Sequence, residues 1–262
     1  MIALLVAVAL WLPPAVLAFL ASFLAAAGAF ELMRAAEEAK YPRLYVWPMI
    51  SAAAIPLGFF FGRGLAVMTA ATVLLMLAMF SEAIFTYGTE RQVPFTAVTA
   101  GLFGGLLIPG CLSALVLMRL LPRGGQVLLM AFVITAGSDN GGYMVGVLFG
   151  KHKGIVKASP HKSAEGFVGS FLGGILCILI FGLILDRAAG IPVNYARLIL
   201  YAVCGNVTTQ LGDLAFSVVK RQHGIKDYGK LIPGHGGVLD RFDSMIFTGP
   251  LVYLLVTLAP AF

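Results

Sequence analysis

The sequence predicts an all-α integral membrane protein, a polytopic bundle of about nine transmembrane helices with a polar cavity that faces the cytoplasm. Of the 262 residues, 60% are hydrophobic and 11% are charged. Soluble domains carry about 45–50% apolar and about 25% charged residues, so this composition excludes an ordinary soluble domain. Apolar stretches long enough to cross a bilayer, about 20 residues each, alternate with short polar segments.

The apolar stretches can be placed in order along the chain. The first apolar run is broken at Pro13-Pro14 and meets its first basic residue at Arg34. We therefore interpret it as two uncleaved membrane segments rather than as a signal peptide. The first of these, residues 2–12, is short for a span of about 20 residues. Further spans are expected at residues 46–61, 65–80, 98–121, 127–150, 167–185, 196–216 and 245–258.

The spans are expected to form two regions. Residues 1–125 would contain about five spans, and the span at 98–121 is expected to kink at Pro109-Gly110. Residues 126–262 contain the remaining spans and most of the polar residues. We expect this second region to be catalytic.

The distribution of basic residues predicts the orientation in the membrane. Thirteen lysines and arginines fall in loops on one side of the predicted bundle and five on the other. The positive-inside rule places the richer side in the cytoplasm, and the compact chain favours the bacterial cytoplasmic (inner) membrane. The net charge of +6 does not indicate nucleic acid, because no basic arm with interleaved aromatic residues is present. Anionic lipids and phosphate substrates explain it better.

The longest polar run, residues 217–244, lies between the last two spans. Asp240 and Asp243 are three residues apart, so a helix would present both carboxylates on one face. Asp213, one turn before Ser217, supplies a third carboxylate. Mg²⁺ is held by such carboxylates while phosphates and water fill its other positions, so we expect Mg²⁺ here, with a second metal ion as an alternative. The competing interpretation is a solvated charged loop, which is common in membrane proteins.

The order of residues in this run resembles the signature of the phosphatidate cytidylyltransferases, also called CDP-diacylglycerol synthases. The matching positions are Ser217, Lys220-Arg221, Lys226-Asp227, Gly229, Ile232-Pro233, His235-Gly236-Gly237 and Asp240-Arg241-Phe242-Asp243. The resemblance implies transfer of CMP from CTP to phosphatidate, giving CDP-diacylglycerol and pyrophosphate.

The resemblance also suggests a role for each residue. We expect metal ligation by Asp213, Asp240 and Asp243, and catalytic roles for these acids together with Lys226 and Arg241. Substrate binding is expected from Ser217, Lys220, Arg221, Asp227, His235, Gly236 and Gly237. Cations and glycine N–H groups suit phosphate oxygens, which carry the charge of both substrates.

A second basic loop, residues 151–167, lies two spans earlier and therefore on the same predicted face. The family usually has Ser-Pro-Lys-Lys-Thr-x-Glu-Gly here, whereas this chain has histidine at position 161 and serine at position 163. These departures leave the role of His161 open. We expect Lys151, Lys162 and Glu165 of this loop to contribute to substrate binding.

Two acids lie within or near the end of apolar spans. An ionisable residue inside the membrane is costly and is a functional candidate by default, so Asp139 is expected to contribute to substrate binding. Its spacing with small residues predicts that its carboxylate points into the bundle. Glu31, near the end of the second span, is explained by a structural pairing with Arg34.

The expected partners are CTP, phosphatidate and membrane lipids, with no nucleic acid. A homodimer is compatible with a bundle that contains 31 glycines. Two other functions stay open at this point. A CTP-dependent kinase of a polyprenol-type lipid would release CDP, and an ion-coupled transporter would use Asp139 and Asp213 as its pathway. The transporter is disfavoured because the sequence lacks evident inverted repeats with matched broken helices.

Overall fold

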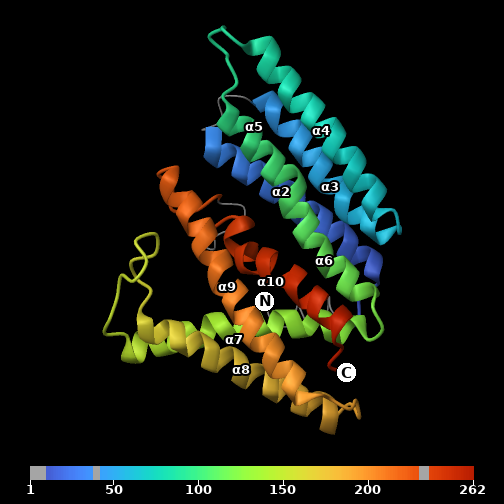
Figure 1. Cartoon of the computed structure of the whole chain (residues 1–262), viewed down its shortest axis with the longest axis vertical. Coiled ribbons are helices and arrows are strands. Elements are labelled where there is room, and N and C mark those ends of the chain that lie inside the picture. Colours follow the sequence, from blue (N-terminus) through green and yellow to red (C-terminus); the bar gives the residue numbers. More distant parts are fainter. Residues whose placement is uncertain (1–9, 38–41, 230–235) are drawn as a thin grey trace. The chain divides into compact units, whose positions relative to one another are not determined.

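The computed structural model describes residues 10–37, 42–229 and 236–262. Its regular elements are all helical, and no strand occurs in this part of the chain (Figure 1). An antiparallel bridge joins Lys153 to Ser163. The elements are α2 (Pro14–Glu37), the 3₁₀ helix η1 (Pro42–Tyr45), α3 (Val46–Phe60), α4 (Gly64–Thr86), α5 (Phe95–Leu102), the π-helical turn η2 (Phe103–Leu107), α6 (Ile108–Leu120), α7 (Gly124–Phe149), α8 (Ala164–Arg187), α9 (Tyr195–Gln222) and α10 (Leu239–Leu258).

Six helical stretches within these residues are long and apolar enough to cross a membrane, which confirms the all-helical membrane class. They are Pro14–Ala36, Arg43–Phe60, Gly64–Thr86, Phe95–Leu120, Ala164–Arg187 and Leu239–Leu258. The predicted total of nine is not confirmed. Helices α7 and α9 are 26 and 28 residues long, but polar residues such as Asp139 and Gln210 interrupt their apolar runs. These two helices carry much of the predicted chemistry.

An irregular turn, η2, directly precedes the kink predicted at Pro109-Gly110 and contains the buried Gly104 and Gly105. The bend of the helix itself stays a prediction. Proline has no N–H to donate to the carbonyl four residues earlier, which is that of Gly105. The Ser51 hydroxyl of α3 donates to this carbonyl at 2.8 Å. A serine from a neighbouring helix thus satisfies the carbonyl that proline leaves without its donor.

The described residues divide into two compact units. One contains residues 10–11, 121–219 and 243–262, and the other contains residues 12–120 and 220–242. The polar segment 220–242 therefore belongs with α2 to α6, although it lies late in the sequence. The predicted regions 1–125 and 126–262 follow chain order, and that division stays a prediction.

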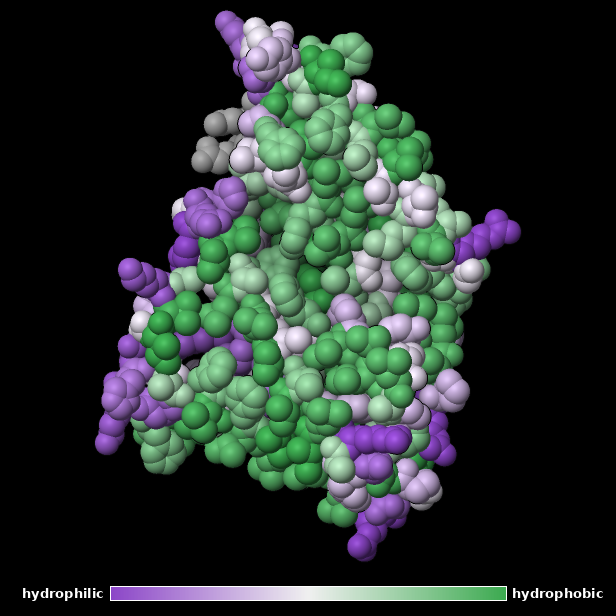
Figure 2. Space-filling model, in the orientation of Figure 1, coloured by the Kyte–Doolittle hydropathy of each residue, from purple (hydrophilic) through white to green (hydrophobic). Residues whose placement is uncertain are grey.

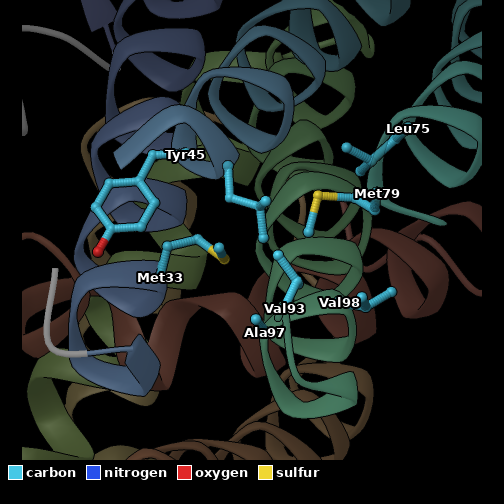
Figure 3. Packing of buried hydrophobic residues seen from close by; sticks show 8 residues of the cluster. Met33, Tyr45, Leu75, Met79, Val93, Ala97 and Val98 are labelled. Carbon is cyan, nitrogen blue, oxygen red and sulfur yellow. The ribbon is translucent and has the colours of Figure 1, made fainter. Parts of the chain in front are cut away.

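A cluster of buried side chains anchors the end of α2 in the unit that contains residues 220–242 (Figure 3). Its members are Met33, Leu44, Tyr45, Leu75, Met79, Val93, Ala97 and Val98. Met33 and Met79 are fully buried, and methionine side chains fill irregular gaps between helices well. The cluster fixes the turn of α2 that also carries Glu31.

In the other unit, α7 packs along α8 through glycines. A Cβ atom at Gly141 would lie 2.5 Å from the Gly169 carbonyl oxygen, and one at Gly173 would lie 2.5 Å from that of Gly137. Small residues allow such close backbone contact between membrane helices. Asp139 is not one of these glycine contacts. Its carboxylate lies close enough to Asp213 and Lys162 to interact electrostatically with both, and its orientation into the bundle stays a prediction.

Many large apolar side chains lie on the outside of the described helices. Leu65 of α4 is 81% exposed and Phe85 is 84% exposed. In Figure 2, hydrophobic residues cover most of the visible face, and hydrophilic residues gather in separate patches. Such apolar surface suits contact with lipid tails, which is consistent with an integral membrane protein.

Candidate functional site

The beginning of α10 brings together the acid and cation that lie twenty residues apart in the signature. Lys220 Nζ donates to Asp240 Oδ1 at 2.8 Å. The backbone N–H groups of Tyr228 and Gly237 donate to Asp240 Oδ2 at 2.8 and 3.0 Å. The side chains of Lys220 and Asp240 are only 11% and 5% exposed. A buried ion pair of this kind fixes the end of α9 to the start of α10, and the two N–H groups hold Tyr228 and Gly237 to the same carboxylate.

Two further N–H groups at the start of α10 are bound by an acid from α2. Val238 and Leu239 donate to the two carboxylate oxygens of Glu31, each at 2.9 Å. The first N–H groups of a helix have no partner within the helix, and an acid there also interacts favourably with the helix dipole. Glu31 thus binds the signature segment, whereas the sequence had suggested a pairing with Arg34.

A second polar network lies in the unit formed by α7, α8, most of α9 and most of α10. Lys162 forms an ion pair with Asp213 and donates to Gln210 Oε1 at 3.0 Å. Gln210 Nε2 in turn donates to Ser170 Oγ at 2.9 Å and to Ser138 Oγ at 3.4 Å. Gln210 and both serines are buried. The network therefore ties the basic loop to three helices at the position of Asp213.

Helices α9 and α10 approach closely beside Asp213. A Cβ atom at Gly212 would lie 2.6 Å from the carbonyl oxygen of Asp243 and 3.1 Å from Ser244 Cα. The threonine pair Thr209 and Thr248 adds a hydrogen bond of 2.9 Å between the same helices. The predicted acids Asp213 and Asp243 thus lie on neighbouring turns of two packed helices, and Asp243 is buried.

We expect Gly212→Ala to destabilise the protein and to lower its activity. The added Cβ would meet backbone atoms of α10 at 2.6 Å, and backbone cannot move aside as the end of a side chain can. Overpacking of this kind costs about 1–3 kcal/mol. The melting temperature in detergent tests the prediction. Gly190→Ala is not a suitable control, because Gly190 has a φ of +64°, where alanine would be strained. A suitable control is Ala189→Gly in the connection between α8 and α9. An unchanged melting temperature for Gly212→Ala would show that α9 and α10 are farther apart than described.

The second basic loop is closed at its base by Glu165. Its carboxylate accepts from His152 N at 3.3 Å and contacts His152 Nδ1 at 2.6 Å. The Ser163 hydroxyl accepts from the N–H of Gly166 at 3.1 Å, which caps the start of α8. Glu165 therefore holds the shape of the loop, and its predicted contact with substrate stays a prediction. Lys151 is exposed near the loop's beginning.

The remaining predicted residues differ in how they are placed. Gly236 has a φ of +81°, a conformation that favours glycine, and Ser217 is buried in α9. His235 lies outside the described residues. Exposed side chains, which suit contact with a soluble nucleotide, belong to Arg221, Lys226, Asp227 and Arg241.

Sequence reasoning missed the roles of Glu31 and Gln210. Both carried a usable signal, because a polar side chain within a largely apolar helix is costly unless it has a partner. Gln210 also lies three residues before Asp213, on the same helical face. The partners themselves come from distant parts of the chain, so the sequence could not name them.

The carboxylates have the chemistry that Mg²⁺ requires, but two of them are paired with lysines. Asp213 is bound by Lys162 and Asp240 by Lys220. Within the described ranges, no group of three or more His, Cys, Asp or Glu side chains is arranged to hold a metal ion. Hard oxygen donors of this type suit Mg²⁺, and magnesium binding stays a prediction.

Comparison with known proteins gives consistent matches. The model of the cytidylyltransferase family matches residues 1–259. The chain is 42% identical over 134 residues to the phosphatidate cytidylyltransferase of Staphylococcus epidermidis, covering 51% of this chain and 50% of that protein. It is 34% identical over 190 residues to the phosphatidate cytidylyltransferase of Bacillus subtilis, covering 72% of this chain and 66% of that protein. The chain thus spans about half the length of the staphylococcal relatives it matches.

Proposed function

Because this chain belongs to the cytidylyltransferase family, we propose that it transfers CMP from CTP to phosphatidate, giving CDP-diacylglycerol and pyrophosphate. The observation that carries the proposal is the start of α10. There Asp240 of the signature is held by Lys220 and two backbone N–H groups, and the exposed cations Arg221 and Lys226 belong to the same segment.

The reaction joins two polyanions and needs little acid or base catalysis. A phosphate oxygen of phosphatidate attacks the α-phosphorus of CTP, and the bond from that phosphorus to the bridging oxygen of the β-phosphate breaks. Pyrophosphate leaves with the electron pair of that bond. A phosphomonoester has a second pKa of about 6, so phosphatidate is largely ionised near neutral pH without a strong base. Charge repulsion and positioning are therefore the main obstacles.

The side chains of the signature suit both the neutralisation of the substrates' charges and the positioning of their phosphates. Arg221, Lys226 and Arg241 are exposed cations that would bind phosphate oxygens. Lys220 is buried against Asp240, so its role in the described geometry is to position the signature segment. Gly237 already donates its N–H to Asp240, and a phosphate contact there would require that hydrogen bond to open.

We also propose Mg²⁺ as the cofactor, with Asp213, Asp240 and Asp243 as its ligands. The support is the donor type and the three-residue spacing of Asp240 and Asp243 on α10. When bound, Mg²⁺ would supply positive charge to the phosphates of both substrates. Lys162 and Lys220 neutralise two of these carboxylates in the described geometry, so each lysine would have to yield a carboxylate oxygen to the ion.

The protein is an integral membrane protein, and the site is proposed to face the cytoplasm of the bacterial inner membrane. The excess of basic residues on one side of the predicted bundle supports this orientation. CTP would then enter from the cytoplasm while the acyl chains of phosphatidate remain in the bilayer. A homodimer stays a prediction.

The test is an assay of both products. We expect the purified protein with CTP, phosphatidate and Mg²⁺ to form pyrophosphate and lipid-linked cytidine in equal amounts. Excess EDTA should prevent formation of both products, because the charges of the two polyanions would no longer be neutralised. Added Mg²⁺ should restore both products. CDP formed with a lipid alcohol in place of phosphatidate would instead establish the kinase, and turnover that survives EDTA would overturn the magnesium proposal.

A further inference from the structure

We propose that Glu31 of α2 is a positioning residue, which holds the start of α10 and the neighbouring Gly229 and Gly237 in the geometry that the transfer requires. The catalytic part of this inference rests on the proposed function. The structural part concerns only contacts among residues of one compact unit and can be tested separately.

Three consecutive N–H groups at the start of α10 are bound by two carboxylates. Gly237 donates to Asp240 at 3.0 Å, and Val238 and Leu239 donate to the two oxygens of Glu31 at 2.9 Å each. Glu31 is only 4% exposed. Because both of its oxygens accept hydrogen bonds from the backbone, the side chain is suited to hold the segment rather than to contact substrate.

The Glu31 carboxylate also explains two glycines of the signature. A Cβ atom at Gly229 would lie 2.5 Å from Glu31 Oε1, and one at Gly237 would lie 2.6 Å from both carboxylate oxygens. Neither glycine has a positive φ, so backbone conformation does not require glycine at either position. The space taken by the Glu31 carboxylate requires it, since both glycines lie directly against this group.

The position of Glu31 is itself fixed by packing. Met33, two residues later in α2, is fully buried in the cluster with Met79 and Val98 (Figure 3). The carboxylate therefore stands on a rigid helix, and the start of α10 is held relative to α2. Residues placed on such supports keep functional side chains within the narrow tolerance that catalysis needs.

Glutamine cannot replace this carboxylate. Val238 and Leu239 donate to different oxygens of Glu31, whereas a glutamine amide offers one oxygen and would turn its NH₂ group toward the other N–H. An unsatisfied buried donor is costly. The Glu31→Gln variant is thus nearly isosteric but loses the specific interaction.

The first experiment measures hydrogen exchange of residues 236–242 in detergent. We expect Glu31→Gln to speed exchange in this segment about tenfold or more, because one of the two backbone N–H groups would face an NH₂ group in place of its acceptor. Glu90→Gln is the matched control, since Glu90 is an exposed acid in the same unit. Unchanged exchange in Glu31→Gln would overturn the proposal. If this variant does not fold, Gly229→Ala gives the same readout, because it displaces the carboxylate without removing it.

The second experiment is a double-mutant cycle on turnover and melting temperature. Gly229→Ala should lower kcat about tenfold in the wild-type background, as the carboxylate is pushed from the N–H groups, and should lower it much less in the Glu31→Ala background. KM for CTP should change less than kcat, because the segment is misplaced rather than deprived of a phosphate ligand. Strictly additive effects would overturn the proposal.

Failure of this inference differs from failure of the proposed function. If the wild type forms no CDP-diacylglycerol, the function fails, while the exchange experiment still decides the role of Glu31 in holding the segment. If the wild type is active and Glu31→Gln keeps both full turnover and unchanged exchange, the function stands and the positioning role is overturned.

Discussion

Asp240→Asn is expected to abolish turnover and to destabilise the protein. Asp240 accepts three hydrogen bonds, one from buried Lys220 and two from backbone N–H groups. Asparagine would leave the lysine charge buried without its partner, a change that typically costs about 3 kcal/mol or more. Its NH₂ group would face either Lys220 or the two backbone donors, because Asp240 Oδ1 accepts from the lysine and Oδ2 from both N–H groups. We expect a clear fall in melting temperature and turnover below about one hundredth of wild type.

The double variant Lys220→Gln/Asp240→Asn separates the two effects. Removing the cation should recover most of the lost melting temperature, because no buried charge remains unpaired. Turnover should stay low if Asp240 acts on the substrates or their metal ion. Glu90→Gln, at an exposed position, is the control for loss of an acid. Recovery of turnover in the double variant would show that Asp240 acts only through Lys220.

Asp213→Asn is expected to lower turnover by about a hundredfold or more with little change in stability. Asp213 is bound by Lys162, and both side chains are 31% exposed, so solvent screens the pair and its loss should cost little folding free energy. The effect on turnover should be large because Asp213 is a proposed magnesium ligand and holds the basic loop. Steady-state kinetics and the melting temperature are the measurements.

Asp186→Asn is the matched control for Asp213. Asp186 is likewise a partly exposed acid near a basic side chain, since Asp186 Oδ2 lies 4.0 Å from Arg187 Nε. It is not part of the proposed site. Turnover of Asp213→Asn within twofold of this control would remove Asp213 from the catalytic residues. A large loss of stability would instead show that the pair with Lys162 is mainly structural.

The class of fold follows from local properties of the sequence. Apolar stretches of the required length predicted most of the helices, and the polar interruptions at Asp139 and Gln210 mark helices that are not apolar enough to count as membrane spans. For Pro109, the local rule says which carbonyl loses its donor but not which side chain replaces it. Ser51, on another helix, supplies that donor.

The residue types of the candidate site also follow from the sequence, but the partners of these residues do not. The spacing of the signature identified Asp240, Lys220 and the glycines, because residue type and local order carry that information. The N–H groups at the start of α10 are bound by Glu31, which lies 207 and 208 residues earlier in the sequence. Lys162 contacts Asp213 and also Gln210, which lies 48 residues later in the sequence. Hydropathy and helical periodicity report which residues share a face of one helix. Which faces then meet depends on side-chain packing between helices, and only the tertiary structure shows that Glu31 determines where Gly229 and Gly237 are required.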